Sequence, residues 1–132
     1  MGQITRGASV YLDANILIRM TEGTQEERAA VGQTLSKYVE ARVVFVTSEL
    51  SFTEVLVHPL RQKNDEQMER YERLLTEFVT PSPVSCEVLL TAAKLRAETP
   101  ALRTPDAIHV ATALLGKASV FLTLTKAAWK PV

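Results

Sequence analysis

Residues 9–18 read SVYLDANILI and mark a place where a strand gives way to a helix. Ser9–Leu12 is a compact, largely apolar run that ends abruptly at an acid, which is typical of a short buried strand. The apolar residues after Asn15 suit a helix, and Asp13 would be a favourable cap for it. The stretch therefore predicts a buried strand running directly into a helix, with a carboxylate at the junction.

Similar strand-like runs recur along the chain and alternate with helical segments. The strand-like runs are 43–46, 77–80 and 120–123. The run 43–46 (VVFV) is continuously apolar, as expected for a strand with both faces buried. The spacing of apolar residues predicts helices over 24–38, 51–56, 65–77 and 84–95, and another from 104 onward.

Helix starts are visible in three places. Thr24 with Glu27 and Ser51 with Glu54 have the spacing of a capping box. Thr104-Pro105 has the residue types of a cap followed by a first-turn proline. Strands that alternate with helices predict an α/β fold, here a three-layer α/β/α sandwich with a mainly parallel central sheet of four or five short strands. Its 132 residues suit a single domain over 1–132.

Composition limits the possible functions. Hydrophobic residues make up 46% and charged residues 23%, as in ordinary folded proteins. Fifteen basic and fifteen acidic residues cancel, so any polyanion must be held by a local cluster of positive charge. The longest purely aliphatic or aromatic run, Val43–Val46, is far too short to cross a membrane. The lone Cys86 excludes an internal disulfide, which fits a reducing compartment, and we expect the protein to be cytoplasmic.

Three carboxylates lie where the chain changes direction: Asp13 after the first strand, Glu54 early in a helix and Asp106 in the first turn of the late helix. Each has a structural explanation, as a cap, a capping-box acceptor or an acid at the positive end of a helix. In a parallel sheet, however, all three are expected at the same edge, with no counter-charge apparent from sequence. Clustered carboxylates suit a hard cation such as Mg²⁺ or Mn²⁺, which can promote phosphodiester hydrolysis.

Four blocks of the sequence resemble the PIN-domain nucleases. Residues 11–18 (YLDANILI) resemble the opening strand and Asp-x-Asn signature of that family, and 47–56 (TSELSFTEVL) resemble its second block. Residues 104–114 (TPDAIHVATAL) are the most specific match, and 120–123 (VFLT) resemble the fourth block. The blocks occur in family order across nearly the whole chain. Small stand-alone chains of this kind are usually VapC-like toxins of type II toxin–antitoxin pairs.

The resemblance implies a Mg²⁺- or Mn²⁺-dependent endoribonuclease. Asp13 and Asp106 would hold the ion, and Glu54 would either bind it through water or orient the attacking water. The implied partners are an RNA substrate, a cognate antitoxin and a second copy of the chain in a homodimer, with no membrane involved. A haloacid-dehalogenase-type phosphatase would need a second Asp at the position of Asn15, and we set that class aside.

Polar residues around the acids would support them. Asn15 would steer Asp13, although Asn is also common at helix starts, and Thr104 and Thr123 would hydrogen-bond around the site. Thr125 stands where family members commonly have a fourth acid. A neutral hydroxyl is a weaker ligand, so metal affinity should fall. The alternative is a degenerate PIN domain that binds RNA or an antitoxin without turnover.

The chain's two histidines receive a structural interpretation. His109 lies one helical turn after Asp106, among small residues, where a packed and hydrogen-bonded imidazole is commoner than a general base. The scattered Lys and Arg side chains are interpreted as ordinary solvated surface.

Overall fold

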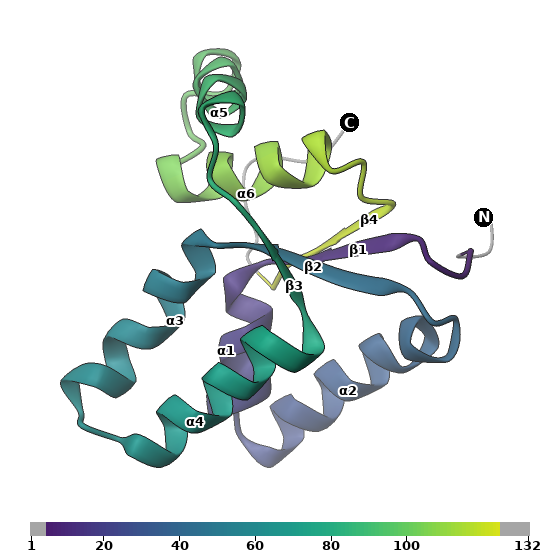
Figure 1. The fold of residues 1–132 in the computed structure, drawn as a ribbon, viewed down its shortest axis with the longest axis vertical. Coiled ribbons are helices and arrows are strands. Elements are labelled where there is room, and N and C mark those ends of the chain that lie inside the picture. Colours follow the sequence, from purple (N-terminus) through teal and green to yellow (C-terminus); the bar gives the residue numbers. More distant parts are fainter. Residues whose placement is uncertain (1–4, 125–132) are drawn as a thin grey trace.

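A parallel sheet forms the centre of the computed structural model, which describes residues 5–124 (Figure 1). Within these residues the sheet has four strands: β1 (Ser9–Leu12), β2 (Val44–Ser48), β3 (Thr80–Ser82) and β4 (Val120–Leu122). Their order is β3-β2-β1-β4, and every pairing is parallel. Strand β1 is an inner strand, and its last three residues are fully buried. The carboxyl end of β1 therefore opens between those of its two neighbours.

Helices cover both faces of the sheet, which confirms the predicted three-layer α/β fold. Figure 1 shows the first four helices on one side and the last two on the other. The first group is α1 (Ala14–Glu22), α2 (Gln25–Glu40), α3 (Leu50–Arg61) and α4 (Asp65–Arg73); the second is α5 (Cys86–Glu98) and α6 (Thr104–Leu115). A five-residue π-helical turn, Leu74–Phe78, extends α4. No helix within the described residues is both long and apolar enough to span a bilayer.

All three predicted helix starts lie within two residues of an observed one, but only one of the predicted caps is correct. Thr24 and Glu27 form the complete capping box of α2. Helix α3 instead begins at Leu50 without a side-chain cap, because the Ser51 side chain is buried and bonded elsewhere. In helix α6 the N-cap position is Arg103, which makes no side-chain cap hydrogen bond, so Thr104 is the first helical residue and not the cap. Pro105 lies in the first turn, as predicted.

The third strand lies further along the chain than predicted. The sequence pattern placed it at 77–80, but the π-helical turn runs through Phe78 and the strand is Thr80–Ser82. Pro81 lies inside the strand, paired with Thr47. A proline is tolerated there because β3 is an edge strand, so its missing N–H costs no ladder hydrogen bond on the open side.

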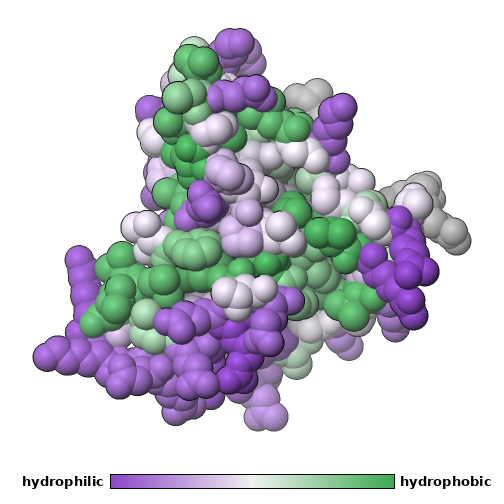
Figure 2. Space-filling model, in the orientation of Figure 1, coloured by the Kyte–Doolittle hydropathy of each residue, from purple (hydrophilic) through white to green (hydrophobic). Residues whose placement is uncertain are grey.

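Apolar packing divides between the two sides of the sheet. The larger cluster joins β1 and β2 to α1, α2, α3 and α4, and the smaller one joins α5 to α6. In Figure 2, apolar side chains lie along α5 at the top of the view, and hydrophilic ones gather over α4 at the bottom. Two i,i+4 ion pairs, Glu66–Arg70 and Glu69–Arg73, lie on the exposed face of α4, as its spacing predicts.

Candidate functional site

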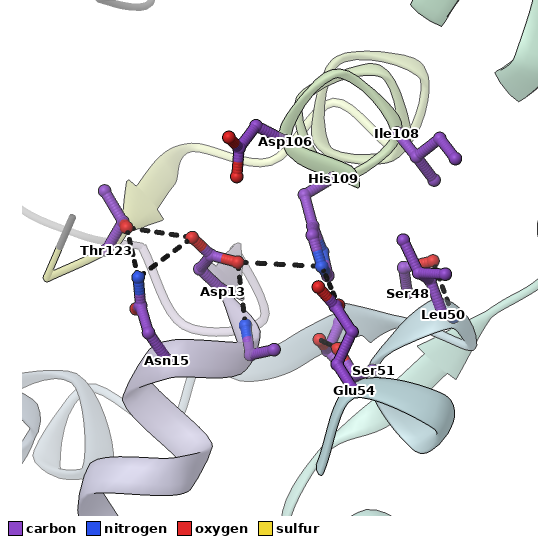
Figure 3. Close-up of polar contacts among 12 residues, drawn as sticks. Asp13, Asn15, Ser48, Leu50, Ser51, Glu54, Asp106, Ile108, His109 and Thr123 are labelled. Carbon is purple, nitrogen blue, oxygen red and sulfur yellow. Dashed lines mark hydrogen bonds and ion pairs between the residues drawn. The ribbon is translucent and has the colours of Figure 1, made fainter. Parts of the chain in front are cut away.

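Asp13 lies at the carboxyl end of β1 and caps α1 (Figure 3). One carboxylate oxygen, Oδ1, accepts from the Ala14 backbone N–H at 2.8 Å. The other, Oδ2, accepts from the Thr123 hydroxyl at 2.9 Å and from the Asn15 amide at 3.3 Å. The residue is only 8% exposed. Asp13 is thus a buried carboxylate held in a single orientation by three donors.

Burial raises the pKa of Asp13, because removing a carboxylate from water disfavours its charged form. The nearby His109 and the hydrogen bond from Thr123 act in the opposite direction. The net direction is upward, so the protein compensates the charge of Asp13 only in part.

Asn15 and Thr123 connect Asp13 to the last described strand. The Asn15 amide donates to the Thr123 hydroxyl at 3.0 Å, and the Leu124 backbone N–H donates to Asn15 Oδ1 at 3.1 Å. The Asp13 backbone N–H also donates to the Leu122 carbonyl at 3.0 Å. Sequence analysis placed Asn15 and Thr123 near Asp13, and both contact its carboxylate.

Glu54 approaches Asp13 from α3, and an imidazole lies between them. His109 Nε2 lies 2.5 Å from Glu54 Oε1 and 3.6 Å from Asp13 Oδ1. Its other ring nitrogen, Nδ1, lies 2.6 Å from the hydroxyl of Tyr11 on β1. The His109 ring is almost fully buried, with 1% of its side chain exposed. The hydrogen-bonded packing expected for His109 is present, but its partners place it inside the candidate site.

Sequence analysis did not include His109 or Tyr11 among the site residues. One signal for His109 was available: it follows Asp106 by three positions, so both side chains face the same side of α6. Seven consecutive residues of that helix, 107–113, are buried, and a buried imidazole requires polar partners. Nothing in the local sequence singles out Tyr11, because its partner is 98 positions away.

A buried pair of hydroxyls ties the start of α3 to β1. Thr47 donates to the Leu12 carbonyl at 2.8 Å, so its single proton is used, and Ser51 must donate to Thr47 across the 2.8 Å between their oxygens. Both residues are fully buried. Leu12 immediately precedes Asp13. The tether therefore holds the first turn of α3, the helix that carries Glu54, beside the end of β1 that carries Asp13.

Asp106 lies in the first turn of α6, and its carboxylate points toward the space beside Asp13 (Figure 3). Its side chain is 26% exposed, and its Oδ2 lies 3.3 Å from Arg103 Nε. The expectation that the acids lack a counter-charge is therefore wrong. Arg103 precedes Asp106 by three positions, so its guanidinium reaches the Asp106 carboxylate within one helical turn.

One expected residue makes no contact with the acids, and another lies beyond the part of the chain that the structure describes. Thr104 is exposed at the start of α6, and within residues 5–124 its hydroxyl makes no hydrogen bond to Asp13, Glu54 or Asp106. Thr125 lies outside the described residues.

The donor set suits a hard divalent cation. Asp13, Glu54 and Asp106 come from three separate elements and offer only oxygen atoms, the ligands that Mg²⁺ and Mn²⁺ prefer. The incompletely compensated charge of Asp13 favours a cation beside it. As the side chains stand, however, the described part of the chain has no group of three His, Cys, Asp or Glu residues arranged to hold a metal ion.

Comparisons with known proteins identify a family model and similar solved structures. A PIN domain family model matches residues 10–126. The chain is similar to a toxin–antitoxin complex from Klebsiella pneumoniae, with 26% identity and a TM-score of 0.64 over 89% of this chain and 88% of that one. It shares its fold with VapBC2 from Rickettsia felis bound to a promoter DNA fragment, with 14% identity and a TM-score of 0.67 over 85% of each chain. A search of curated proteins gave no match.

Proposed function

The chain belongs to the PIN-domain family, and from this we propose that it is a metal-dependent endoribonuclease acting as the toxin of a toxin–antitoxin pair. The observation that carries the proposal is the placement of Asp13, Glu54 and Asp106 around one space at the carboxyl edge of the sheet (Figure 3). The similarity to a toxin–antitoxin complex at 26% identity supports the toxin role and an antitoxin partner.

Each acid has a defined part in the proposed chemistry. A bound Mg²⁺ or Mn²⁺ would lower the pKa of a water ligand and neutralise charge developing on the phosphoryl group. Asp13, held by Ala14, Asn15 and Thr123, keeps its oxygens in place without rearrangement. Asp106 adds a second carboxylate. Glu54, on the opposite side of Asp13 from Thr123, is suited to orient the attacking water (Figure 3).

The test is RNA cleavage by purified protein with Mn²⁺ or Mg²⁺. We expect the wild type to cut structured RNA and both Asp13→Asn and Asp106→Asn to abolish cutting. Asp65→Asn is the matched control, because Asp65 is the one remaining aspartate of the sequence and lies in the first turn of α4, outside the site. Equal activity of the wild type and the two site variants would contradict the proposal.

The competing function is binding without turnover, and Thr125 is the residue that favours it. If the wild type and both variants are equally inert on a broad RNA panel but bind an antitoxin, the degenerate domain is the correct description. A Thr125→Asp variant separates the two cases further. A gain of metal affinity and of cutting would show that the site lacks only its fourth acid.

We also propose that the protein forms a homodimer and acts in the cytoplasm, where its RNA substrate is found. Light scattering of the purified protein tests the first statement, and a monomer at micromolar concentration would contradict it. Fractionation of cells that express the tagged protein tests the second.

A further inference from the structure

Tyr11, His109 and Glu54 form a hydrogen-bonded chain that crosses the molecule from the sheet to the candidate site. Tyr11 is on the inner strand β1, His109 on α6 and Glu54 on α3, so the chain joins both helical layers through the sheet. The two links measure 2.6 Å and 2.5 Å. Tyr11 is fully buried and His109 is 1% exposed, so neither ring can exchange its partner for water.

The chemistry of the two ends assigns the protons in this chain. An ionised carboxylate can only accept, so the proton between His109 and Glu54 belongs to His109 Nε2. A neutral imidazole then has a bare Nδ1, which must accept from the Tyr11 hydroxyl. The Tyr11 hydroxyl carries one proton, which it can donate to Nδ1 across the 2.6 Å between the two atoms. Both ring nitrogens are satisfied by this assignment.

The orientation of the His109 imidazole gives the two neighbouring acids different contacts. His109 Nε2 bonds to Glu54, whereas its 3.6 Å distance to Asp13 Oδ1 is too long for a hydrogen bond. Within residues 5–124, this is the single hydrogen bond to the Glu54 carboxylate, and the Glu54 side chain is 30% exposed. Without His109, Glu54 would be free to turn toward solvent.

We propose that His109 is a positioning residue whose Nε2–H, set by the Tyr11 hydroxyl at Nδ1, holds the Glu54 carboxylate at the edge of the site beside Asp13. This inference rests on the proposed function for its effect on cleavage, but not for the hydrogen bonds themselves. In metal sites, removing a residue that orients a ligand commonly lowers affinity or activity by about 10- to 100-fold. We expect a loss in that range when a substitution of His109 removes its hydrogen bonds to Tyr11 and Glu54.

The first experiment is ¹⁵N NMR of the imidazole side chains in metal-free protein. The chain has two histidines, so a His58→Gln variant assigns the His109 signals. We expect the proton on Nε2 and none on Nδ1. A proton on Nδ1 of His109 would overturn the proposal, because Tyr11 would then not be the donor. This measurement requires neither metal nor activity.

The second experiment compares His109→Leu with His109→Gln, which retains an N–H donor near the position of Nε2. We expect His109→Leu to bind Mn²⁺ about 10- to 100-fold more weakly in calorimetric titration and to lose kcat while KM for RNA is preserved. His109→Gln should recover most of both losses. Wild-type affinity and kcat in a folded His109→Leu would overturn the proposal.

A conservative pair covers the possibility that His109→Leu does not fold. Tyr11→Phe removes only the hydroxyl that sets the imidazole, whereas Tyr38→Phe removes the hydroxyl of a buried tyrosine on α2, away from the site. We expect weaker Mn²⁺ binding in Tyr11→Phe and no change in Tyr38→Phe; equal affinity in both would overturn the proposal. A wild type that binds Mn²⁺ but cuts no RNA refutes the proposed function alone. If the wild type binds no Mn²⁺, the ¹⁵N NMR measurement of the His109 ring protons alone tests the proposal.

Discussion

The buried tether between Thr47 and Ser51 allows a quantitative prediction about stability. Thr47→Val conserves the shape of the side chain but removes the hydroxyl that donates to the Leu12 carbonyl and accepts from Ser51. Both groups lose this partner in the buried interior. Each buried group left unsatisfied costs about 1–3 kcal/mol, so we expect Thr47→Val, which leaves two of them, to lose about 2–6 kcal/mol of unfolding free energy. At roughly 4 °C per kcal/mol, Tm should fall by about 8–24 °C.

Urea denaturation followed by circular dichroism measures this loss. Thr112→Val is the matched control: Thr112 is also buried, but its hydroxyl donates to the Ile108 carbonyl within its own helix. Such a bond adds little to stability, so the control should cost under about 1 kcal/mol. Adding Ser51→Ala to Thr47→Val should cost less than the two single losses combined, because the two residues share one bond. Strict additivity, or a Thr47→Val loss no larger than that of the control, would refute the reasoning.

Three further predictions concern charge and backbone. Burial raises the pKa of Asp13, so the folded protein binds a proton at this carboxylate more tightly than the unfolded chain does. The resulting contribution to the free energy of unfolding is present at low pH and is lost as pH rises through the pKa of the folded state. Asp13→Asn should therefore gain stability relative to wild type as pH rises above the ordinary aspartate pKa of about 4 in metal-free urea titrations, and a constant difference would contradict this. Arg103→Gln should change stability by less than about 0.5 kcal/mol, because the Arg103 side chain is 77% exposed, yet bind Mn²⁺ more tightly in calorimetric titration, since a positive charge beside Asp106 is removed. Unchanged Mn²⁺ affinity in Arg103→Gln would show that the Arg103 charge does not oppose a cation beside Asp106. Gly32→Ala should add about 0.5–1 kcal/mol in the open interior of α2, whereas Gly23→Ala should destabilise, because a Cβ there would lie 2.4 Å from a carbonyl oxygen; thermal melts that rank them in reverse order would be contrary evidence.

Local signals in the sequence predicted the layers of the fold well. The abrupt end of Ser9–Leu12 at Asp13 and the capping box of Thr24 both depend on residues a few positions apart, and both appear as expected. The pair Ser51 and Glu54 has the same spacing, yet Ser51 bonds to Thr47 at the end of β2 and Glu54 bonds to His109 on α6. Capping chemistry is therefore a weaker guide where a helix start is buried.

The third strand shows a second limit of local patterns. The apolar residues around Phe78 suit a strand as well as a helix, and the packing of Phe78 against Phe45 favours the continued helix. The run of residues that pairs with β2 contains Pro81, which a propensity argument excludes from strands. Only the position of β3 at the edge of the sheet makes that residue acceptable.

The candidate site was predictable in its acids but not in its connections. The residue types Asp13, Glu54 and Asp106 and their places after strands predicted a common edge. The role of His109 could not be read from the sequence, because it depends on Tyr11 and Glu54, which approach it from other elements. Arg103, by contrast, has a local signal, because it precedes Asp106 by three positions and so lies within one helical turn of it.

The bond between Thr123 and Asp13 joins positions 110 residues apart, close to the two ends of the described chain. During synthesis Asp13 leaves the ribosome long before Thr123, the residue that follows β4 and donates to Asp13 Oδ2. Contacts of such high sequence separation form late in folding. A nascent polypeptide that stops short of Thr123 therefore lacks the donor that aligns this carboxylate oxygen.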